Sequence, residues 1–232
     1  MGTVIEIINI IGIISFSAAG AMIAIDKEND LFGVILMSVM TCFGGGIMRD
    51  MIAGNSIGRM LPVFFTDMKM EIIVCIITAL VVFLLALRFK TEYVREEESV
   101  YKINNILDAL GIGVFTTLGT SAYLELGPFV AVTMGVITAV GGGAIRDVFL
   151  RSVPIILHKR VYAIPCIFGG IIYYLIAEVW MKGMDAAFTV ATVCCILFIF
   201  VMRVLATYFE WDIPKAIDFN SIKIDDIKSV DK

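Results

Sequence analysis

Long apolar runs follow one another along almost the whole chain, and short polar segments separate them. The seven runs cover residues 4–25, 31–51, 70–87, 103–123, 127–150, 161–180 and 186–208. Each run has about the length that a helix needs to cross a hydrocarbon core of roughly 30 Å. Because the runs are continuous and do not alternate between apolar and polar residues, they do not fit the strands of a membrane barrel. The pattern predicts an all-α membrane protein with seven transmembrane helices.

The composition agrees with this prediction. Hydrophobic residues make up 59% of the 232 residues, and the mean hydropathy of +0.95 is well above that of soluble domains. The first run is not expected to be a cleaved signal peptide, because the first lysine, Lys27, follows it instead of preceding it. The five cysteines lie within apolar runs at no metal-ligand spacing, so we read them as small buried hydrophobes and predict no metal site and no cofactor.

The basic residues predict an orientation. If the N-terminus lies outside, 14 of the 18 lysines and arginines fall on the cytoplasmic side, and the 4 others are Arg49, Arg59, Lys69 and Lys182. Loops rich in lysine and arginine stay in the cytoplasm. We therefore expect an inner-membrane protein with its N-terminus outside and its C-terminus in the cytoplasm. The net charge of −4 gives no sign of a nucleic-acid partner.

One short motif occurs twice. Residues 43–50 read Phe-Gly-Gly-Gly-Ile-Met-Arg-Asp, and residues 140–147 read Val-Gly-Gly-Gly-Ala-Ile-Arg-Asp. Each copy lies in the second of three consecutive runs. Since three is an odd number, the second set of three must enter the membrane in the opposite sense. The sequence thus predicts two inverted three-helix repeats plus a seventh helix, a layout found in many transport proteins.

This repeat divides the chain into five parts. We expect a first three-helix repeat at 1–87, a cytoplasmic linker at 88–102 and a second, inverted three-helix repeat at 103–180. The seventh helix follows at 181–211, and a polar C-terminal tail at 212–232.

The glycine triplets are the first candidate site, and two readings stay open for them. They are Gly44, Gly45, Gly46, Gly141, Gly142 and Gly143. Small residues let membrane helices approach closely. However, packing does not require three glycines in a row. Each glycine costs about 1 kcal/mol relative to alanine in a helix. Glycine-interrupted helices at matching places of two halves mark binding or permeation sites in transporters. We favour this second reading, in which broken helices line a pathway.

Arg49–Asp50 and Arg146–Asp147 are the second candidate site. In one reading they anchor helix ends, with the arginine reaching the headgroups and the aspartate neutralising it. In the other they stand at the two mouths of one pathway, where the arginines brace the helices and the aspartates attract cations. Both readings can hold together.

Other polar residues are read more simply. Asn9 and Asp108 match each other at an offset of 99, and we read them as residues that cap or complement helix starts. His158, Lys159 and Arg160 precede Tyr162, and we read them as an orientation-setting basic cluster beside an interfacial aromatic residue. The alternative is a contact with the headgroup of an anionic membrane lipid.

No enzyme is predicted. The chain has no Gly-x-Ser-x-Gly, no His-Glu-x-x-His and no phosphate-binding loop that ends in Gly-Lys-Ser/Thr.

At the paired Gly-Gly-Gly-x-x-Arg-Asp motifs the sequence resembles the prokaryotic TRIC (trimeric intracellular cation) channel family, also catalogued as a glycine-transporter or uncharacterised duplicated membrane domain family. The second motif continues as Val-Phe-Leu-Arg-Ser-Val-Pro over residues 148–154, and the resemblance spans about residues 5–205. The first copy departs from the pattern after Asp50, which puts the end of that helix in question. The resemblance implies a homotrimer with one pore inside each protomer, lined by the second and fifth helices kinked at their glycines.

Two functions remain open at this stage. The resemblance implies a channel for monovalent cations, K⁺ and Na⁺. A secondary transporter of a small zwitterion such as glycine fits the inverted repeat equally well on physical grounds. A membrane scaffold without transport is the third alternative, and the cost of the repeated charges disfavours it.

Overall fold

The computed structural model describes residues 2–54, 62–66, 68–158, 161–184 and 186–211. Within these ranges the chain is helical and contains no β-strand. The long helices are α1 (Gly2–Asp26), α2 (Leu31–Ala53), α4 (Lys69–Arg88), α6 (Glu97–Ser121), α7 (Pro128–Phe149), α9 (Ile164–Tyr174), which continues as the π-helical segment η3 (Leu175–Trp180), and α10 (Ala187–Tyr208). The short elements are α3 (Val63–Thr66), α5 (Lys90–Arg95), α8 (Ile155–His158) and the 3₁₀ turn η2 (Leu124–Leu126).

Five of these helices are long and apolar enough to cross a membrane: α1, α2, α4, α7 and α10. The apolar helix formed by α9 and η3 is shorter. Helix α6 has the length but carries Asn104, Asn105 and Asp108, which lower its apolar content. It is instead a central helix, with twelve of its residues buried. Polar groups are tolerated in such a helix because neighbouring helices shield them from lipid.

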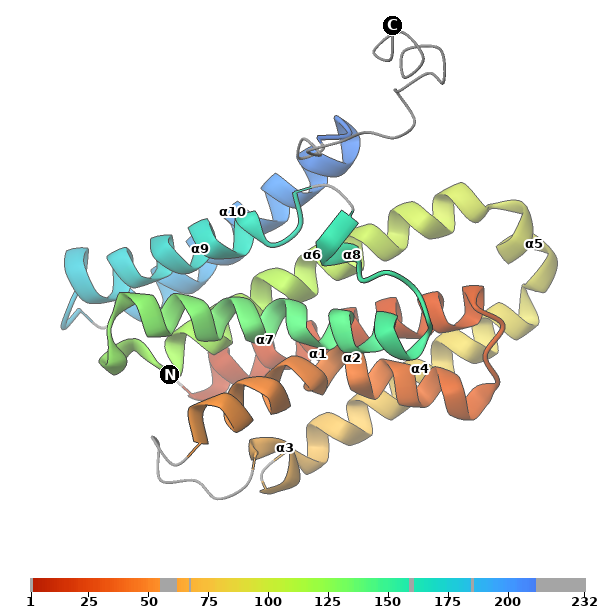
Figure 1. Cartoon of the computed structure of the whole chain (residues 1–232), viewed down its shortest axis with the longest axis horizontal. Helices are drawn as coiled ribbons and strands as arrows, with labels where there is room; N and C mark the ends of the chain where they lie inside the picture. The colour runs from red at the N-terminus through yellow and green to blue at the C-terminus, as the bar shows by residue number, and fades with distance from the viewer. Residues whose placement is uncertain (1, 55–61, 67, 159–160, 185, 212–232) are drawn as a thin grey trace, which may run out of the picture.

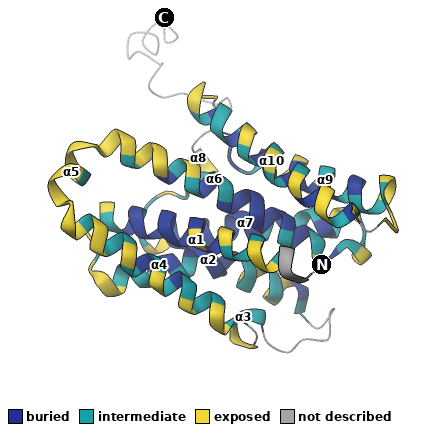
Figure 2. Ribbon diagram, turned by 180° about the vertical axis from the view of Figure 1, so that it is seen from behind, coloured by how far each residue is buried: buried dark blue, intermediate teal, exposed yellow. Residues whose placement is uncertain are grey.

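Successive long helices run in opposite directions along one bundle (Figure 1). We call the end where α1 begins the first end of the bundle and the end where α1 finishes the second end. Helices α1 and α6 run in opposite directions, as do α2 and α7. Buried residues gather on α1, α2, α6 and α7, whereas α5 and the outer surface of α4 are exposed (Figure 2).

Local sequence signals explain where several helices begin. The Asp30 side chain accepts a hydrogen bond of 2.8 Å from the Gly33 N–H and so caps α2. Gly127 has φ +89°, a conformation that favours glycine, and Pro128 follows it as the first residue of α7.

The segment 88–102, predicted as a linker, is largely helical. It contains α5, and α6 begins at Glu97, six residues before the predicted start at 103. An ion pair of 2.6 Å between Lys102 and Glu98, one turn apart, supports this first polar turn. The Tyr93 hydroxyl in α5 donates to Asp26 over 3.1 Å and ties the segment to the end of α1. Burial, followed by the Asp26 charge, raises the pKa of Tyr93.

The core forms where α1 crosses α6. The rings of Phe16 and Phe115 stack with centroids 5.0 Å apart. Gly111 makes this crossing close, because a Cβ atom there would overlap the Phe16 ring. All five cysteines are free thiols, and all but Cys194 are buried, which agrees with their reading as small core residues.

Candidate functional site

The two glycine triplets meet where α2 crosses α7. A Cβ atom on Gly45 would overlap the carbonyl oxygen of Thr138 and lie 2.9 Å from that of Ile137. A Cβ atom on Gly142 would likewise overlap the carbonyl oxygen of Thr41. Gly45 and Gly142 are matching positions of the two motif copies, and so are Thr41 and Thr138. Each helix therefore rests the middle glycine of its triplet on the backbone of the other.

Helix α2 continues to Ala53 and α7 to Phe149, so neither helix ends at its glycine triplet. A kink at the glycines and their place along a pathway stay predictions. Tertiary contact explains why the helical state survives the low propensity of glycine, since close backbone packing offsets a cost of about 1 kcal/mol per residue. The middle glycines thus serve helix packing.

The third glycine of each triplet has a different environment. The nearest group to a Cβ atom on Gly46 is the Arg49 guanidinium at 3.9 Å, and Gly46 lines a cavity. A Cβ atom on Gly143 would lie 3.5 Å from the Tyr162 hydroxyl. These are ordinary contact distances, so the third glycines are not required for the helix crossing.

The Arg–Asp pairs make matching contacts in the two halves. Arg49 Nε donates to Asp50 Oδ1 over 2.8 Å, and Arg146 Nε donates to Asp147 Oδ1 over 2.9 Å. The second oxygen of each aspartate accepts a backbone N–H at 2.9 Å, from Val63 for Asp50 and from Ile155 for Asp147.

Those two N–H groups start the short helices α3 and α8, directly after Pro62 and Pro154. Each aspartate therefore neutralises its arginine and also holds the segment that follows its helix. The reading of these pairs as braces is consistent with this geometry. The reading as anchors in the headgroups does not fit Arg146, whose side chain is 0% exposed, against 14% for Arg49.

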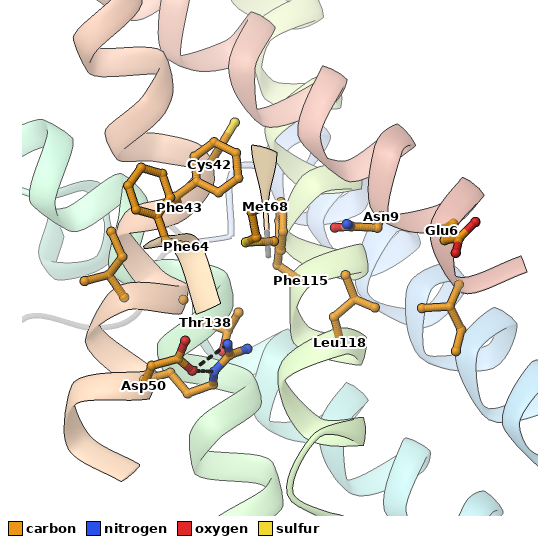
Figure 3. A pocket seen from close by; sticks show the side chains of 14 residues that line it. Glu6, Asn9, Cys42, Phe43, Asp50, Phe64, Met68, Phe115, Leu118 and Thr138 are labelled. Atoms are coloured by element: carbon orange, nitrogen blue, oxygen red, sulfur yellow. Dashed lines mark hydrogen bonds and ion pairs between the residues drawn. The ribbon is translucent and has the colours of Figure 1, made fainter. Parts of the chain in front are cut away.

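A cavity of about 190 Å³ lies near the first end of the bundle, and we call it the Arg49 cavity (Figure 3). Its polar lining includes Glu6 and Asn9 from α1 and the Arg49–Asp50 pair from α2. Figure 3 shows Asp50 and Asn9 on different sides of this space. The apolar lining residues are Ile5, Cys42, Phe43, Ile47, Phe64, Met68, Phe115 and Leu118.

A second cavity, of about 600 Å³, lies near the second end, and we call it the Asp108 cavity. Acidic side chains exceed basic ones in its lining. The acidic residues are Asp26, Glu97, Asp108 and Asp147, and the basic residues are Lys27 and Arg203. Its polar uncharged lining residues are Tyr101, Asn104, Asn105, Ser152, Tyr162 and Thr207.

Three side chains from distant parts of the chain, two of them on helices and one in the segment before α9, join beside this cavity. Arg203 of α10 forms an ion pair of 2.8 Å with Asp108 of α6. The Tyr162 hydroxyl donates to the other oxygen of Asp108 over 3.1 Å. The Arg203 guanidinium lies 4.1 Å from the centroid of the Tyr162 ring, within the range of a cation–π contact.

This cluster corrects two of the sequence readings. Asp108 lies inside α6, eleven residues after its start at Glu97, so it does not cap a helix. Asn9 also lies inside its helix, α1, where its amide contacts Glu71 at 3.5 Å. Tyr162 is buried, with 4% of its surface exposed, and is not an interfacial aromatic residue.

Sequence reasoning missed Arg203 as a site residue. We counted it among the cytoplasmic charges because a basic residue near the end of an apolar run usually sets orientation. The available signal was its place inside the last run, with several apolar residues on each side. Such an intramembrane arginine needs a partner, and Asp108 was the carboxylate inside an apolar run near that end with no arginine beside it in the sequence.

The structure describes only part of the basic cluster formed by His158, Lys159 and Arg160. Lys159 and Arg160 lie outside the described residues, and His158 ends α8. The lipid contact proposed there stays a prediction. Among the residues that the structure describes, no group of three or more His, Cys, Asp or Glu side chains could hold a metal ion.

Comparison with known proteins gives a consistent result. The family model described as "Glycine transporter" matches residues 6–87 and 105–178. The chain is 37% identical over 169 residues to the UPF0126 inner membrane protein YadS of Escherichia coli strain K12, which covers 72% of this chain and 75% of that protein. It is 28% identical over 214 residues to the UPF0126 membrane protein YvgT of Bacillus subtilis, covering 90% of this chain and 95% of that one.

Solved structures match over nearly the whole chain. A TRIC cation channel, solved to explain conductance, has a TM-score of 0.75 and 29% identity, and the match covers 92% of this chain and 97% of that one. The TRIC trimeric intracellular cation channel orthologue from Rhodobacter sphaeroides has a TM-score of 0.73 and 26% identity, with 90% and 99% covered.

The helix crossing yields a first prediction. Gly45→Ala and Gly142→Ala should each lower stability by about 1–3 kcal/mol, because the new methyl group meets an opposing backbone carbonyl that has no room to move. Thermal unfolding of the protein in detergent measures the effect. Gly46→Ala and Gly143→Ala are the matched controls and should unfold within a degree or two of the unchanged protein. Equal losses at all four positions would contradict the division of roles among the glycines.

The Arg–Asp pairs yield a second prediction. Asp147→Asn leaves the fully buried Arg146 without its counter-charge and should cost about 3–5 kcal/mol. Asp50→Asn should cost less, because Arg49 retains access to the Arg49 cavity. The same unfolding assay compares the two variants. If Asp50→Asn is as harmful as Asp147→Asn, the difference in burial has no energetic consequence.

Proposed function

We propose that this protein is a cation channel. The chain belongs to the family of TRIC-like membrane proteins described as glycine transporters. The observation that carries the proposal is the match to TRIC cation channels at a TM-score of 0.75 over 92% of the chain. Identity of 29% extends the likeness beyond the fold. The matched structures are channels and not enzymes, which agrees with the lack of enzyme motifs in the sequence.

We further propose seven membrane-spanning helices arranged as two inverted repeats plus α10. In this layout α1, α2 and α4 form the first repeat, and α6, α7 and the helix made by α9 and η3 form the second. The opposite directions of α1 and α6 support it (Figure 1). So do the matching contacts of Gly45 with Thr138 and of Gly142 with Thr41.

The pathway in this proposal runs inside one protomer, along α2 and α7. The Arg49 cavity and the Asp108 cavity lie near its two ends, and the glycine crossing lies between them. Both cavities carry more acidic than basic side chains. An acidic lining raises the local concentration of cations, which supports cation permeation without a narrow carbonyl filter. We therefore expect K⁺ and Na⁺ to pass with weak selectivity.

The assembly in this proposal is a homotrimer, with no pore on the axis between protomers. The name of the Rhodobacter sphaeroides relative describes that protein as trimeric. Each protomer here has its own pair of cavities, so a complete pathway does not need residues from a second copy.

Transport of a small zwitterion such as glycine is the second candidate. The description of the matching family favours it. The Arg49 cavity contains both an arginine and carboxylates, which are the groups that a zwitterion needs for its two charged ends.

Recording from purified protein in planar bilayers separates the two candidates. A channel gives unitary current steps in KCl or NaCl without any organic solute. Vesicles that contain the same protein should then show no saturable uptake of labelled glycine. Silent bilayers together with saturable glycine uptake would reject the channel and support the transporter.

The proposed orientation has its own test. The protein should lie in the inner membrane with its N-terminus outside and its C-terminus in the cytoplasm, because most lysines and arginines then face the cytoplasm. Green fluorescent protein fused after residue 232 should fluoresce in living cells. Alkaline phosphatase at the same place should be inactive. An active phosphatase fusion would reverse the assigned orientation.

A further inference from the structure

The Asp108 carboxylate has no free oxygen. One oxygen bonds to Arg203 at 2.8 Å, and the other accepts the Tyr162 hydroxyl at 3.1 Å. The side chains of Asp108 and Arg203 are only 7% and 6% exposed, although both line the Asp108 cavity. In such a place the charge of the guanidinium cancels the charge of the carboxylate with little screening by water.

Three buried polar atoms of the cavity lining lack a hydrogen-bond partner: Asn104 Oδ1, Asn105 Nδ2 and Arg203 Nε. The Oδ1 atom of Asn104 is buried and has no hydrogen-bond partner, and the residue is 9% exposed. Asn104 precedes Asp108 by one helical turn and lines the same cavity. An amide oxygen and a carboxylate on one helix face are typical ligands of a hard cation. On the same cluster, Nε of Arg203 also has no acceptor, so Asp108 engages Arg203 through only part of its guanidinium.

Arg203 has no counterpart in the other half of the molecule. It belongs to α10, which follows both motif-bearing segments. The residue that matches Asp108 at an offset of 99 is the neutral Asn9, whose partner is Glu71 of α4 at 3.5 Å. The carboxylate and the arginine therefore occur together at one end of the molecule only. Packing of the repeated helices alone does not require either charge.

We propose that Asp108 and Asn104 form a binding site for a monovalent cation and that Arg203 occupies this site as a tethered competitor. The inference rests on the proposed cation-channel function and adds a regulatory element to it. With Arg203 paired to Asp108, the deep part of the Asp108 cavity presents no free carboxylate. When α10 withdraws Arg203, a K⁺ or Na⁺ ion takes its place and the total charge at the site is unchanged.

The groups around this site fit an exchange of one cation for another. Asp147 is not available as an alternative ligand, because Arg146 and the Ile155 N–H engage both of its oxygens. The Tyr162 ring, in the segment just before α9, contacts the Arg203 guanidinium through its face, a contact that a compact ion such as K⁺ does not need. Loss of Arg203 should therefore leave a site that still prefers a cation.

The first experiment compares Arg203→Gln with the unchanged protein in planar bilayers at low salt. We expect the unitary K⁺ current or the open fraction to rise roughly two- to ten-fold, because a freed carboxylate concentrates cations in the cavity. Arg88→Gln is the matched control, since it removes an exposed arginine at the same end of the bundle. It should change the current far less. An equal or smaller current in a folded Arg203→Gln protein would overturn the inference.

The second experiment needs no current and keeps the two proposals distinguishable. Thermal unfolding in detergent is measured in KCl and in matched choline chloride. K⁺ should raise the Tm of Arg203→Gln by about 2 °C or more, because it binds only the folded site. It should not do so for the double variant Asp108→Asn/Arg203→Gln. A shift of equal size in the double variant, or no shift in either, would overturn the inference even if the channel conducts.

Silent bilayers for the unchanged protein would reject the channel function alone, and the unfolding assay would still decide on the cation site.

If Arg203→Gln does not fold, Arg203→Lys takes its place in both assays. A lysine keeps the charge but has a smaller head that leaves space beside Asp108. We expect it to pass more current than arginine and to gain a K⁺-dependent shift in Tm. Failure of both effects would overturn the inference.

Discussion

The structure depends on a contact between two backbones. Where α2 crosses α7, Gly45 rests on the carbonyl of Thr138, and Gly142 rests on the carbonyl of Thr41. No side chain larger than a hydrogen atom fits at either place. Because lipid provides no hydrophobic driving force between helices, such close packing is a main source of their association. The cavities near the two ends of the bundle keep their places because this crossing holds α2 and α7 together.

The charged groups follow from the same constraint. Helices packed this closely bury their ends, so the arginines of the two motifs need counter-charges from their own chain. Asp50 and Asp147 supply them and also fix the starts of α3 and α8. One carboxylate therefore links the end of a long helix to the segment that leaves it. A change at the aspartate affects both elements together.

Much of this fold could be predicted from the sequence. The apolar run at 127–150 became α7 (Pro128–Phe149), and the run at 186–208 became α10 (Ala187–Tyr208). Run length fixes such elements because membrane thickness sets them. The paired motifs also identified the residues that meet at the centre. The three glycines in a row did not reveal that the middle one makes the close contact while Gly46, the third of the first triplet, lines a cavity.

The remaining errors concern contacts between distant residues. Asp108 and Arg203 are 95 residues apart, and Tyr162 joins them from the segment before α9. Each of them has a simpler local meaning as a helix cap, an orientation signal or an interfacial ring. The packing of α6, α10 and the segment before α9 brings them together. Helix α6 begins before the apolar run at 103–123, because its first turns are polar and carry the ion pair between Lys102 and Glu98.

The pairing of buried charges has a consequence for the electric field across the membrane. Arg49, Arg146 and Arg203 each lie within 2.8 Å of a carboxylate oxygen. A helix movement that keeps such a pair intact carries no net charge through the field, so the membrane potential performs no work on it. Separation of such a pair would move net charge through the field. Because Asp108 and Arg203 lie on different helices, theirs is the pair that a relative movement of helices can separate.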